Sequence, residues 1–245
     1  MAMRILITND DGIAAPALPH LVKWAQSLGE VTVVAPKIEQ SGKSQAIDFF
    51  REVEIKRTPR LGDVEAWAMD STPADCVRFG ITGLKKEYDL VISGINRGYN
   101  LGDDIAYSGT VGAIMEAARL GVPAIAFSMN YEAKAEDVID QLDSVLDFMN
   151  ENGLWDCGSL YNVNLHSTPE GICITRQGGM FYSDAFEKRD GDYYIQVGDP
   201  IRNEVLDLTV DTDAIWAGYT TVTPLTHNRT DKEVLAKLMG NKSAK

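Results

Sequence analysis

The chain has 245 residues, of which 44% are hydrophobic and 24% are charged, so it can bury a sizeable core and is not mainly disordered. Asp and Glu total 36 against 23 Lys and Arg, and the formal net charge of −13 argues against binding to duplex nucleic acid through bulk electrostatics. No apolar stretch approaches the roughly 18 residues of a membrane span, and no signal peptide opens the chain. Three widely spaced cysteines and three widely spaced histidines predict reduced thiols, no zinc site and a cytoplasmic protein without a membrane partner.

Strands and helices alternate in the first half of the sequence. Short apolar, β-branched runs are typical of strands covered on both faces, and segments with helical spacing of apolar residues lie between them. The predicted strands are Arg4–Thr8, Val31–Ala35, Asp89–Ser93 and Pro123–Ser128. The predicted helices run from Pro16 to about Leu28 and from Thr110 to Leu120. This alternation indicates an α/β fold with a doubly wound, mainly parallel sheet.

The pattern changes beyond about Leu160. Short strand-like runs follow one another without a long helix between them and suggest antiparallel hairpins. These runs are Tyr161–Leu165, Ile172–Arg176 and Tyr193–Val197. The segment Asp48–Met69 has a similar pattern, and a short amphipathic helix is predicted over Asp231–Met239.

No internal repeat, low-complexity stretch or Pro-rich linker divides the sequence. We therefore expect a single domain over residues 1–245, with a core over about residues 1–160. A β-rich extension and the C-terminal helix would occupy about residues 161–245, and the last residues, Asn241–Lys245, are expected to be frayed.

Polar loops rich in small residues follow three of the predicted strands. They are Asn9–Gly12, Gln40–Ser44 and Gly94–Asp104. In open α/β sheets, ligands bind outside the carboxyl ends of the strands. The convergence of three such loops on one edge therefore predicts a ligand site there, and it is a stronger indication than any single motif.

Asp10 and Asp11 are adjacent carboxylates at the end of the first predicted strand. Like charges this close repel each other unless a cation lies beside them. The alternative is a turn followed by a helix N-cap, because Asp is common before helices. The position at a strand end, near hydroxyl and amide oxygens, favours a metal site for a hard divalent ion such as Mg²⁺ or Mn²⁺.

The segment Tyr107–Thr110 directly precedes a predicted helix. Backbone N–H groups at a helix start, with hydroxyls beside them, can bind an anion such as phosphate. The alternative is that Ser108 or Thr110 is simply the N-cap of the helix. The two interpretations are compatible, because a capped helix can still present its amides to phosphate.

Other polar residues are expected to have structural roles. The segment Asp70–Val77 places Pro73 at the first helical position and is a strong helix start. Cys76 falls on the apolar face of that helix and is assigned to the core. Glu116 lies among small residues in a helix as a candidate ion-pair partner, and Asn100 is expected to shape its loop.

Five blocks of the sequence carry a family resemblance. They are Met3–Pro16, Ser41–Gly42, Ser71–Val77, Ser93–Thr110 and Thr223–Leu225. Together they resemble the SurE family of survival proteins, and the longest block spans 18 residues in order. The resemblance implies a Rossmann-like domain, a homodimer or homotetramer and one divalent metal ion per subunit, Mg²⁺ or Mn²⁺. It also implies a 5′-nucleotidase acting on nucleoside monophosphates, in some members with 3′-nucleotidase or exopolyphosphatase activity.

Site residues follow from the resemblance by position. It implies metal ligands at Asp10, Asp11, Ser41 and Asn96. It implies phosphate or substrate contacts at Ser44, Asn96, Ser108, Gly109 and Thr110. The sequence departs from the family pattern at Ser71, His166, Gly179 and Asn228, and these departures bear on substrate preference and subunit contacts. We expect an apolar, C-terminal subunit interface near Trp216 and the final helix.

The resulting hypothesis is metal-assisted hydrolysis of a phosphomonoester. Asp10 or Asp11 would orient or deprotonate the attacking water, and the helix start would hold the phosphoryl oxygens. The alternative is a nucleotide-binding regulatory protein without turnover. A phosphatase that forms an aspartyl-phosphate typically has Asp-x-Asp after its first strand, whereas here the two residues are adjacent. A dinucleotide oxidoreductase would have GxGxxG after that strand, which this sequence lacks.

Overall fold

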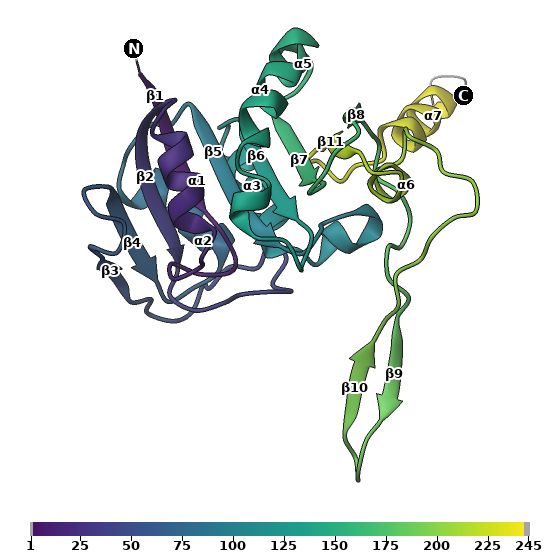
Figure 1. The fold of residues 1–245 in the computed structure, drawn as a ribbon, viewed down its shortest axis with the longest axis horizontal. Coiled ribbons are helices and arrows are strands. Elements are labelled where there is room, and N and C mark those ends of the chain that lie inside the picture. The colour runs from purple at the N-terminus through teal and green to yellow at the C-terminus, as the bar shows by residue number, and fades with distance from the viewer. Residues whose placement is uncertain (1, 243–245) are drawn as a thin grey trace.

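The structure, a computed structural model, describes residues 2–242 and is drawn in Figure 1. Its strands are β1 (Met3–Thr8), β2 (Gly29–Pro36), β3 (Ile55–Arg57), β4 (Glu65–Met69), β5 (Leu90–Arg97), β6 (Ala124–Met129), β7 (Leu160–Leu165), β8 (Ile172–Ile174), β9 (Ala185–Lys188), β10 (Tyr194–Val197) and β11 (Thr220–Pro224). Its α-helices are α1 (Leu18–Ala25), α2 (Pro73–Arg78), α3 (Gly109–Arg119), α4 (Gln141–Glu151), α5 (Leu154–Cys157), α6 (Asp211–Trp216) and α7 (Lys232–Lys242).

Within these residues, nine strands form one sheet in the order β3-β4-β2-β1-β5-β6-β7-β11-β8, and β9 with β10 forms a separate hairpin. Six neighbouring strands, from β4 to β7 in that order, run parallel to one another. β3 and β11 are antiparallel to their neighbours in this parallel group. The predicted doubly wound, mainly parallel sheet is therefore confirmed.

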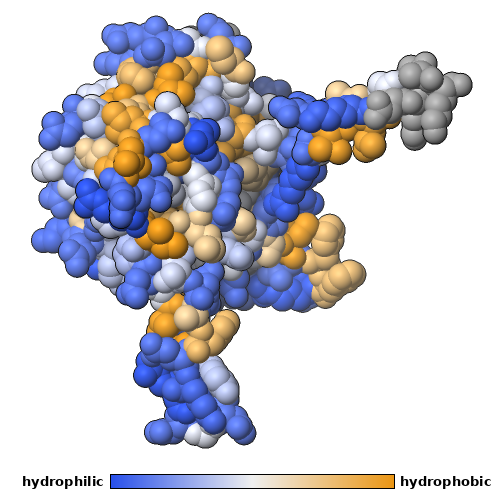
Figure 2. All heavy atoms as spheres, turned by 90° about the vertical axis from the view of Figure 1, so that its right-hand side faces the viewer, coloured by the Kyte–Doolittle hydropathy of each residue, from blue (hydrophilic) through white to orange (hydrophobic). Residues whose placement is uncertain are grey.

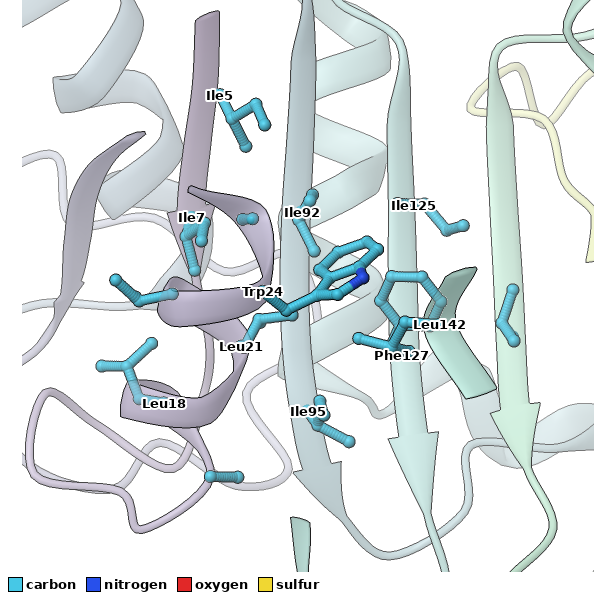
Figure 3. Close-up of a cluster of buried hydrophobic side chains, with 14 of the residues drawn as sticks. Ile5, Ile7, Leu18, Leu21, Trp24, Ile92, Ile95, Ile125, Phe127 and Leu142 are labelled. Carbon is cyan, nitrogen blue, oxygen red and sulfur yellow. The ribbon is translucent and has the colours of Figure 1, made fainter. Parts of the chain in front are cut away.

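The side chains of β1 alternate between the two faces of the sheet and pack against different helices. Ile5 and Ile7 belong to a buried cluster that includes residues of α1 and α4, which Figure 3 shows in part. Leu6 belongs to a second cluster, with residues of α2 and α3. In the first cluster Trp24 packs edge-on against Phe127, with ring centroids 6.0 Å apart. Helices cover both faces, which explains why the central strands are continuous apolar runs.

The start of α2 agrees with the sequence, whereas α1 begins at Leu18, two residues after the predicted start at Pro16. The hydroxyl of Thr72 accepts a hydrogen bond from the backbone N–H of Asp75 at 3.2 Å, and Pro73 begins α2 as predicted. α3 begins at Gly109, one residue before the predicted start. α1 ends at Ala25, earlier than predicted, and the turn that follows leads directly into β2.

The prediction of antiparallel hairpins beyond Leu160 is wrong for the first two runs. In the second run, β8 pairs in parallel with β11. β7 runs parallel to β6 and extends the central sheet. The chain reaches it through α4, a crossover helix that sequence analysis overlooked. The sequence of α4 is rich in Asp and Asn, and only Leu142, Val145 and Met149 are buried along it, so its apolar stripe is narrow. A parallel pair of strands needs such a crossover.

The β9–β10 hairpin is antiparallel, as predicted, and projects away from the sheet in Figure 1. α7 begins one residue after the predicted start of the C-terminal helix and continues to Lys242, so Asn241 and Lys242 are helical and not frayed as expected. The remaining residues expected to be frayed, 243–245, lie outside the described part of the chain. Among the helices of residues 2–242, none is both long and apolar enough to cross a bilayer.

Candidate active site

The candidate site lies where the carboxyl ends of β1, β2 and β5 meet. β2 and β5 pair with opposite edges of β1, so the strand order reverses at this point. Ligands of open α/β sheets bind at such reversals. The backbone N–H of Gln40, in the loop after β2, donates to the backbone carbonyl of Asp10 at 2.7 Å. The loops that follow the first two strands of the chain are therefore joined to each other.

Asp10 is buried, with 4% of its surface exposed, and it binds the start of α3. Its Oδ1 accepts from the hydroxyl of Thr110 at 2.5 Å, and its Oδ2 accepts from the backbone N–H of the same residue at 3.2 Å. A Cβ atom placed on Gly109 would lie 2.9 Å from the Cβ of Asp10, which explains the glycine at this point. The structure thus brings together three of the predicted site residues.

Asp11 lies beside Asp10 and is less completely buried. The backbone N–H of Arg97, at the end of β5, donates to its Oδ2 at 3.4 Å. Burial, followed by the charge of Asp10, raises the pKa of Asp11 to about 6. Burial also raises the pKa of Asp10. The negative charges of this pair are therefore poorly compensated by the protein, and a cation beside them would stabilise both.

Ser41 and Asn96 were predicted to complete the metal site. The hydroxyl of Ser41 donates to Oε1 of Glu39 at 2.7 Å, which leaves its oxygen as an acceptor. The amide nitrogen of Asn96 donates to the carbonyl of Gly98 at 2.7 Å, which leaves the amide oxygen as an acceptor. Glu39, which sequence analysis did not single out, also raises the pKa of both aspartates through its charge.

The donor set is consistent with a hard divalent ion. Residues 2–242 contain no group of three or more His, Cys, Asp or Glu side chains placed to hold a metal. A metal here would therefore be bound by two carboxylates together with amide and hydroxyl oxygens. Oxygen donors of this kind suit Mg²⁺ or Mn²⁺ and do not suit a thiolate or imidazole metal site.

The predicted phosphate residues surround the first turn of α3. Ser108 is the N-cap, and its Oγ accepts from the backbone N–H of Val111 at 3.1 Å. Ser44 has a positive φ of 53°, and its hydroxyl donates to the carbonyl of Ala106 at 2.7 Å. Its backbone N–H donates to the carbonyl of Tyr107 at 2.9 Å. In this structure Ser44 therefore fixes the two residues before the N-cap, while the helix start itself lies against Asp10.

The loop between β5 and α3 is held down by a buried polar network centred on Asn100. The side-chain amides of Asn162 and Asn164, both on β7, donate to the backbone carbonyl of Asn100 at 2.8 and 2.9 Å. Oδ1 of Asn164 accepts from the backbone N–H of Asn100 at 2.8 Å. The side chain of Asn100 in turn donates to the hydroxyl of Ser128 on β6 at 2.7 Å. As expected, Asn100 shapes the loop. Hydrogen bonds with the neighbouring strands β6 and β7 fix the position of Asn100.

Sequence reasoning missed other residues that shape the site. The side chain of Asn9 exchanges two hydrogen bonds of 3.0 Å with the backbone of Gly12 and so closes the turn after β1. Asn at the head of a turn is a recognisable signal for this role. Asp211 accepts from the backbone N–H groups of Gly102 and Gly178 at 3.0 and 2.7 Å, and so joins the β5–α3 loop to the C-terminal part of the chain. That contact had no signal in the sequence.

Comparison with known proteins shows the family to which the chain belongs. The model of the family "Survival protein SurE" matches residues 5–184. The chain belongs to the SurE family. It is 38% identical to the 5′-nucleotidase SurE of Thermosipho melanesiensis and 39% identical to 5′-nucleotidase SurE 1 of Thermus thermophilus, and these alignments cover 96% and 97% of both chains. The crystal structure of the SurE protein from Aquifex aeolicus has a TM-score of 0.81 and 32% identity, covering 98% of this chain and 99% of that one.

Two structural expectations for this SurE protein are confirmed. Cys76 is fully buried in the cluster under α2. Glu116 is buried and pairs with Arg78 at 3.0 Å and Arg119 at 2.6 Å, and it also accepts from the amide of Gln45. Its role in α3 is therefore that of a structural ion-pair partner. The compensated charge of Glu116 contrasts with the poorly compensated pair at the sheet edge.

Two of the four departures from the SurE pattern, Ser71 and Gly179, make contacts outside the predicted site residues. The hydroxyl of Ser71 donates to Oδ2 of Asp75 at 2.6 Å, so it adds a contact at the start of α2. The carbonyl of Gly179 accepts from the backbone N–H of Asp103 at 3.1 Å, in the β5–α3 loop. The region around Gly179 thus touches the loop that leads to α3, whereas Ser71 supports a different helix.

Proposed function

We propose that this SurE protein is a metal-dependent 5′-nucleotidase that hydrolyses nucleoside monophosphates to nucleoside and phosphate. The observation that carries the proposal is the pair Asp10 and Asp11, poorly compensated and placed against the start of α3. The near-full-length similarity to relatives named 5′-nucleotidase SurE supports the nucleotide-hydrolysing activity. One divalent ion per subunit, Mg²⁺ or Mn²⁺, is part of the proposal. A cytoplasmic location, as expected from the sequence, is also part of it.

The two aspartates have different roles in the proposed chemistry. The ion, when held by Asp10, Asp11, Ser41 and Asn96, would supply positive charge to the phosphoryl oxygens and promote loss of a proton from water. Both oxygens of Asp10 accept hydrogen bonds from Thr110, so that carboxylate is fixed in place. Asp11 accepts one long hydrogen bond, through Oδ2, from the backbone of Arg97, so we assign it the role of orienting the attacking water.

The start of α3 would bind the phosphoryl group. Backbone N–H groups in the first turn carry partial positive charge and point toward the N-terminal end of the helix. Gly109 lets the helix approach Asp10 closely, and Ser108 fixes the direction of the first turn through its N-cap bond. Charge that develops on the phosphoryl oxygens would therefore meet donors that are already oriented. 3′-Nucleotidase and exopolyphosphatase activities are further proposals for the same site.

We also infer that the chain functions as a homodimer or homotetramer. Exposed apolar residues on the β9–β10 hairpin and on α7 support this inference. They are Phe186, Tyr193, Tyr194, Val234, Leu238 and Met239. Figure 2 shows α7 extending from the body of the protein with apolar side chains along one side. Trp216, which is also expected near the interface, stacks on Phe181 of its own chain, with centroids 5.5 Å apart.

Phosphate release from a panel of nucleoside monophosphates tests the proposed activity. We expect release with Mg²⁺ or Mn²⁺, no release with EDTA, and different rates for different nucleotides. Measurable nucleotide binding without release under any metal condition would contradict the proposal and favour a regulatory protein. Trapping of a phosphorylated aspartate would point instead to an aspartyl-phosphate mechanism. Nucleoside 3′-monophosphates and polyphosphate in the same panel test the two further activities.

A further inference from the structure

Tyr131 and Arg97 form an exposed stack beside the candidate site. The guanidinium carbon of Arg97 lies 4.3 Å from the centroid of the Tyr131 ring. The ring is 62% exposed, although an aromatic side chain would normally be expected to bury more of its surface. Arg97 is the last residue of β5, and Tyr131 lies two residues after the end of β6. The stack therefore stands at the same sheet edge as Asp10 and Asp11.

Backbone contacts hold this stack in place. Nε of Arg97 donates to the carbonyl of Tyr131 at 2.7 Å. The backbone N–H of Gly98 donates to the carbonyl of Met129 at 2.9 Å, which joins the ends of β5 and β6. The Asn130 side chain accepts from the backbone N–H of Glu132 at 2.8 Å and closes the turn that carries Tyr131. The ring is thus presented by a built turn and not by a loose loop.

The stack also has a direct connection to the proposed chemistry. The backbone N–H of Arg97 donates to Asp11, while the side chain of the same residue covers one face of the Tyr131 ring. A phosphate bound at the aspartates would therefore lie near the backbone of Arg97. The side chain of the same residue reaches the exposed ring of Tyr131. Nucleobases stack on aromatic rings and on guanidinium planes, with about 1–3 kcal/mol lost per base when an aromatic platform is truncated to alanine.

We propose that the Tyr131–Arg97 stack is the subsite for the base of the nucleotide. The inference rests on the proposed function and deepens it. It gives a binding subsite to the base, which is the part of the substrate that distinguishes a nucleotide from other phosphomonoesters. Stacking accepts any base, so Tyr131 would favour nucleotides as a class over phosphomonoesters without a base. Tyr107, which is 65% exposed and lies just before the start of α3, is the alternative aromatic platform.

The test compares two ligands that differ only in the base, adenosine 5′-monophosphate and ribose 5-phosphate. Dissociation constants are measured by calorimetry with Mn²⁺ present, because the proposed ion binds the phosphoryl group, and with the non-hydrolysable phosphonate analogue of each ligand, so that no turnover consumes it. Tyr131→Ala keeps the carbonyl that holds Arg97, and we expect it to weaken binding of adenosine 5′-monophosphate by about tenfold and that of ribose 5-phosphate by less than about twofold. Tyr131→Trp should restore the affinity for adenosine 5′-monophosphate, since it restores the stacking surface.

The matched control is Tyr107→Ala, which should leave the ratio of the two dissociation constants unchanged. The proposal is overturned if Tyr131→Ala leaves both constants unchanged, if it changes both equally, or if Tyr107→Ala alone reduces the preference for the base. Because the readout is binding, it decides the subsite whether or not phosphate is released. Failure of the proposed function would appear separately, as absence of phosphate release by the unaltered protein with metal.

Discussion

The edge of the sheet and the β9–β10 hairpin place polar and apolar residues in opposite ways. At the edge, Asp10, Asn100 and Asn164 are buried, and each is held by hydrogen bonds to segments far away in the sequence. On the hairpin, Phe186 and Tyr193 are 72% and 77% exposed. Buried polar groups and exposed aromatic rings both have an energetic cost unless something else compensates for it.

The difference suggests what compensates in each region. At the edge, the hydrogen bonds come from the same chain, so a single subunit can assemble the loops around the candidate site. For the hairpin, a second copy of the chain is the proposed partner that would cover the rings. This comparison leads to a clear expectation: alterations at the edge should reduce chemistry, whereas alterations on the hairpin should affect assembly.

Outside the two aspartates themselves, the largest effect on catalysis is expected from breaking the Asn100 network. Asn164→Leu removes the acceptor for the backbone N–H of Asn100 and one of the two amide donors to its carbonyl. We expect phosphate release to fall by about 100-fold, because a small displacement of the loop before α3 misplaces catalytic groups. Steady-state kinetics on protein with a native circular dichroism spectrum is the measurement.

Two further variants keep this prediction falsifiable. Thr223→Val alters the same polar row of the sheet, but the hydroxyl that it removes hydrogen-bonds to Thr175 and not to Asn100. It should change the rate by less than about threefold. Asn164→Asp keeps an acceptor for the N–H of Asn100 and should retain more activity than Asn164→Leu. Equal rates for Asn164→Leu and the unaltered protein would show that the network does not position the loop.

A second, smaller effect on chemistry is expected from the hairpin. Phe186 and Tyr194 share one face of it, because Phe186 pairs with Gln196 in the antiparallel register. The double variant Phe186→Ser, Tyr194→Ser should lower the molecular mass measured by light scattering while changing phosphate release by about twofold or less. Glu187→Gln, on the opposite face, should leave the mass unchanged. An unchanged mass in the double variant would remove the hairpin from the interface.

The smallest effect is expected in the pH dependence of stability without metal. The pKa of Asp11 is about 6 in the folded protein and near 3.9 in an unfolded chain. As pH rises from 4 to 6, the unfolded chain loses this proton first, so the free energy of unfolding should fall and then stay low above pH 6. After allowance for the partial exposure of Asp11, we expect about 1 kcal/mol.

Urea unfolding in EDTA at pH 4 and pH 7 measures this effect. The variant Asp11→Asn should become more stable relative to the unaltered protein as pH rises, by that same amount. Asp103→Asn, an exposed aspartate in the β5–α3 loop, serves as the control. If Asp11→Asn and the unaltered protein show the same pH dependence, the charge at Asp11 does not oppose folding.

Local sequence patterns were enough to predict the centre of the fold. β1 and β2 are continuous apolar runs, which favour buried strands through their own composition. Pro73 favours a helix start through its own backbone geometry, independently of its neighbours in space. α4 escaped prediction because its apolar stripe is narrow among acidic and amide residues. The wrong prediction for the direction of β7 followed from missing α4, because a strand that follows a crossover helix runs parallel to the strand before that helix.

The site divides in the same way. Asp10 and Asp11 were recognisable because they follow a strand and stand together, which is a local pattern. The contacts of Asn162 and Asn164 with Asn100 join residues more than 60 positions apart, so no local pattern indicates them. The stack of Arg97 on Tyr131 depends on the pairing of β5 with β6, and it too is visible only in three dimensions.

The central claim is that the carboxylates at the sheet edge carry metal-dependent hydrolysis, and the variant Asp10→Asn tests it most directly. Phosphate release from a nucleoside 5′-monophosphate is measured with Mn²⁺ for this variant, the unaltered protein and the control Asp103→Asn. We expect Asp10→Asn to lose activity by about 1,000-fold or more while keeping a native circular dichroism spectrum, because the amide cannot supply the negative charge that holds the ion. Near-normal release by folded Asp10→Asn with metal present would contradict the account.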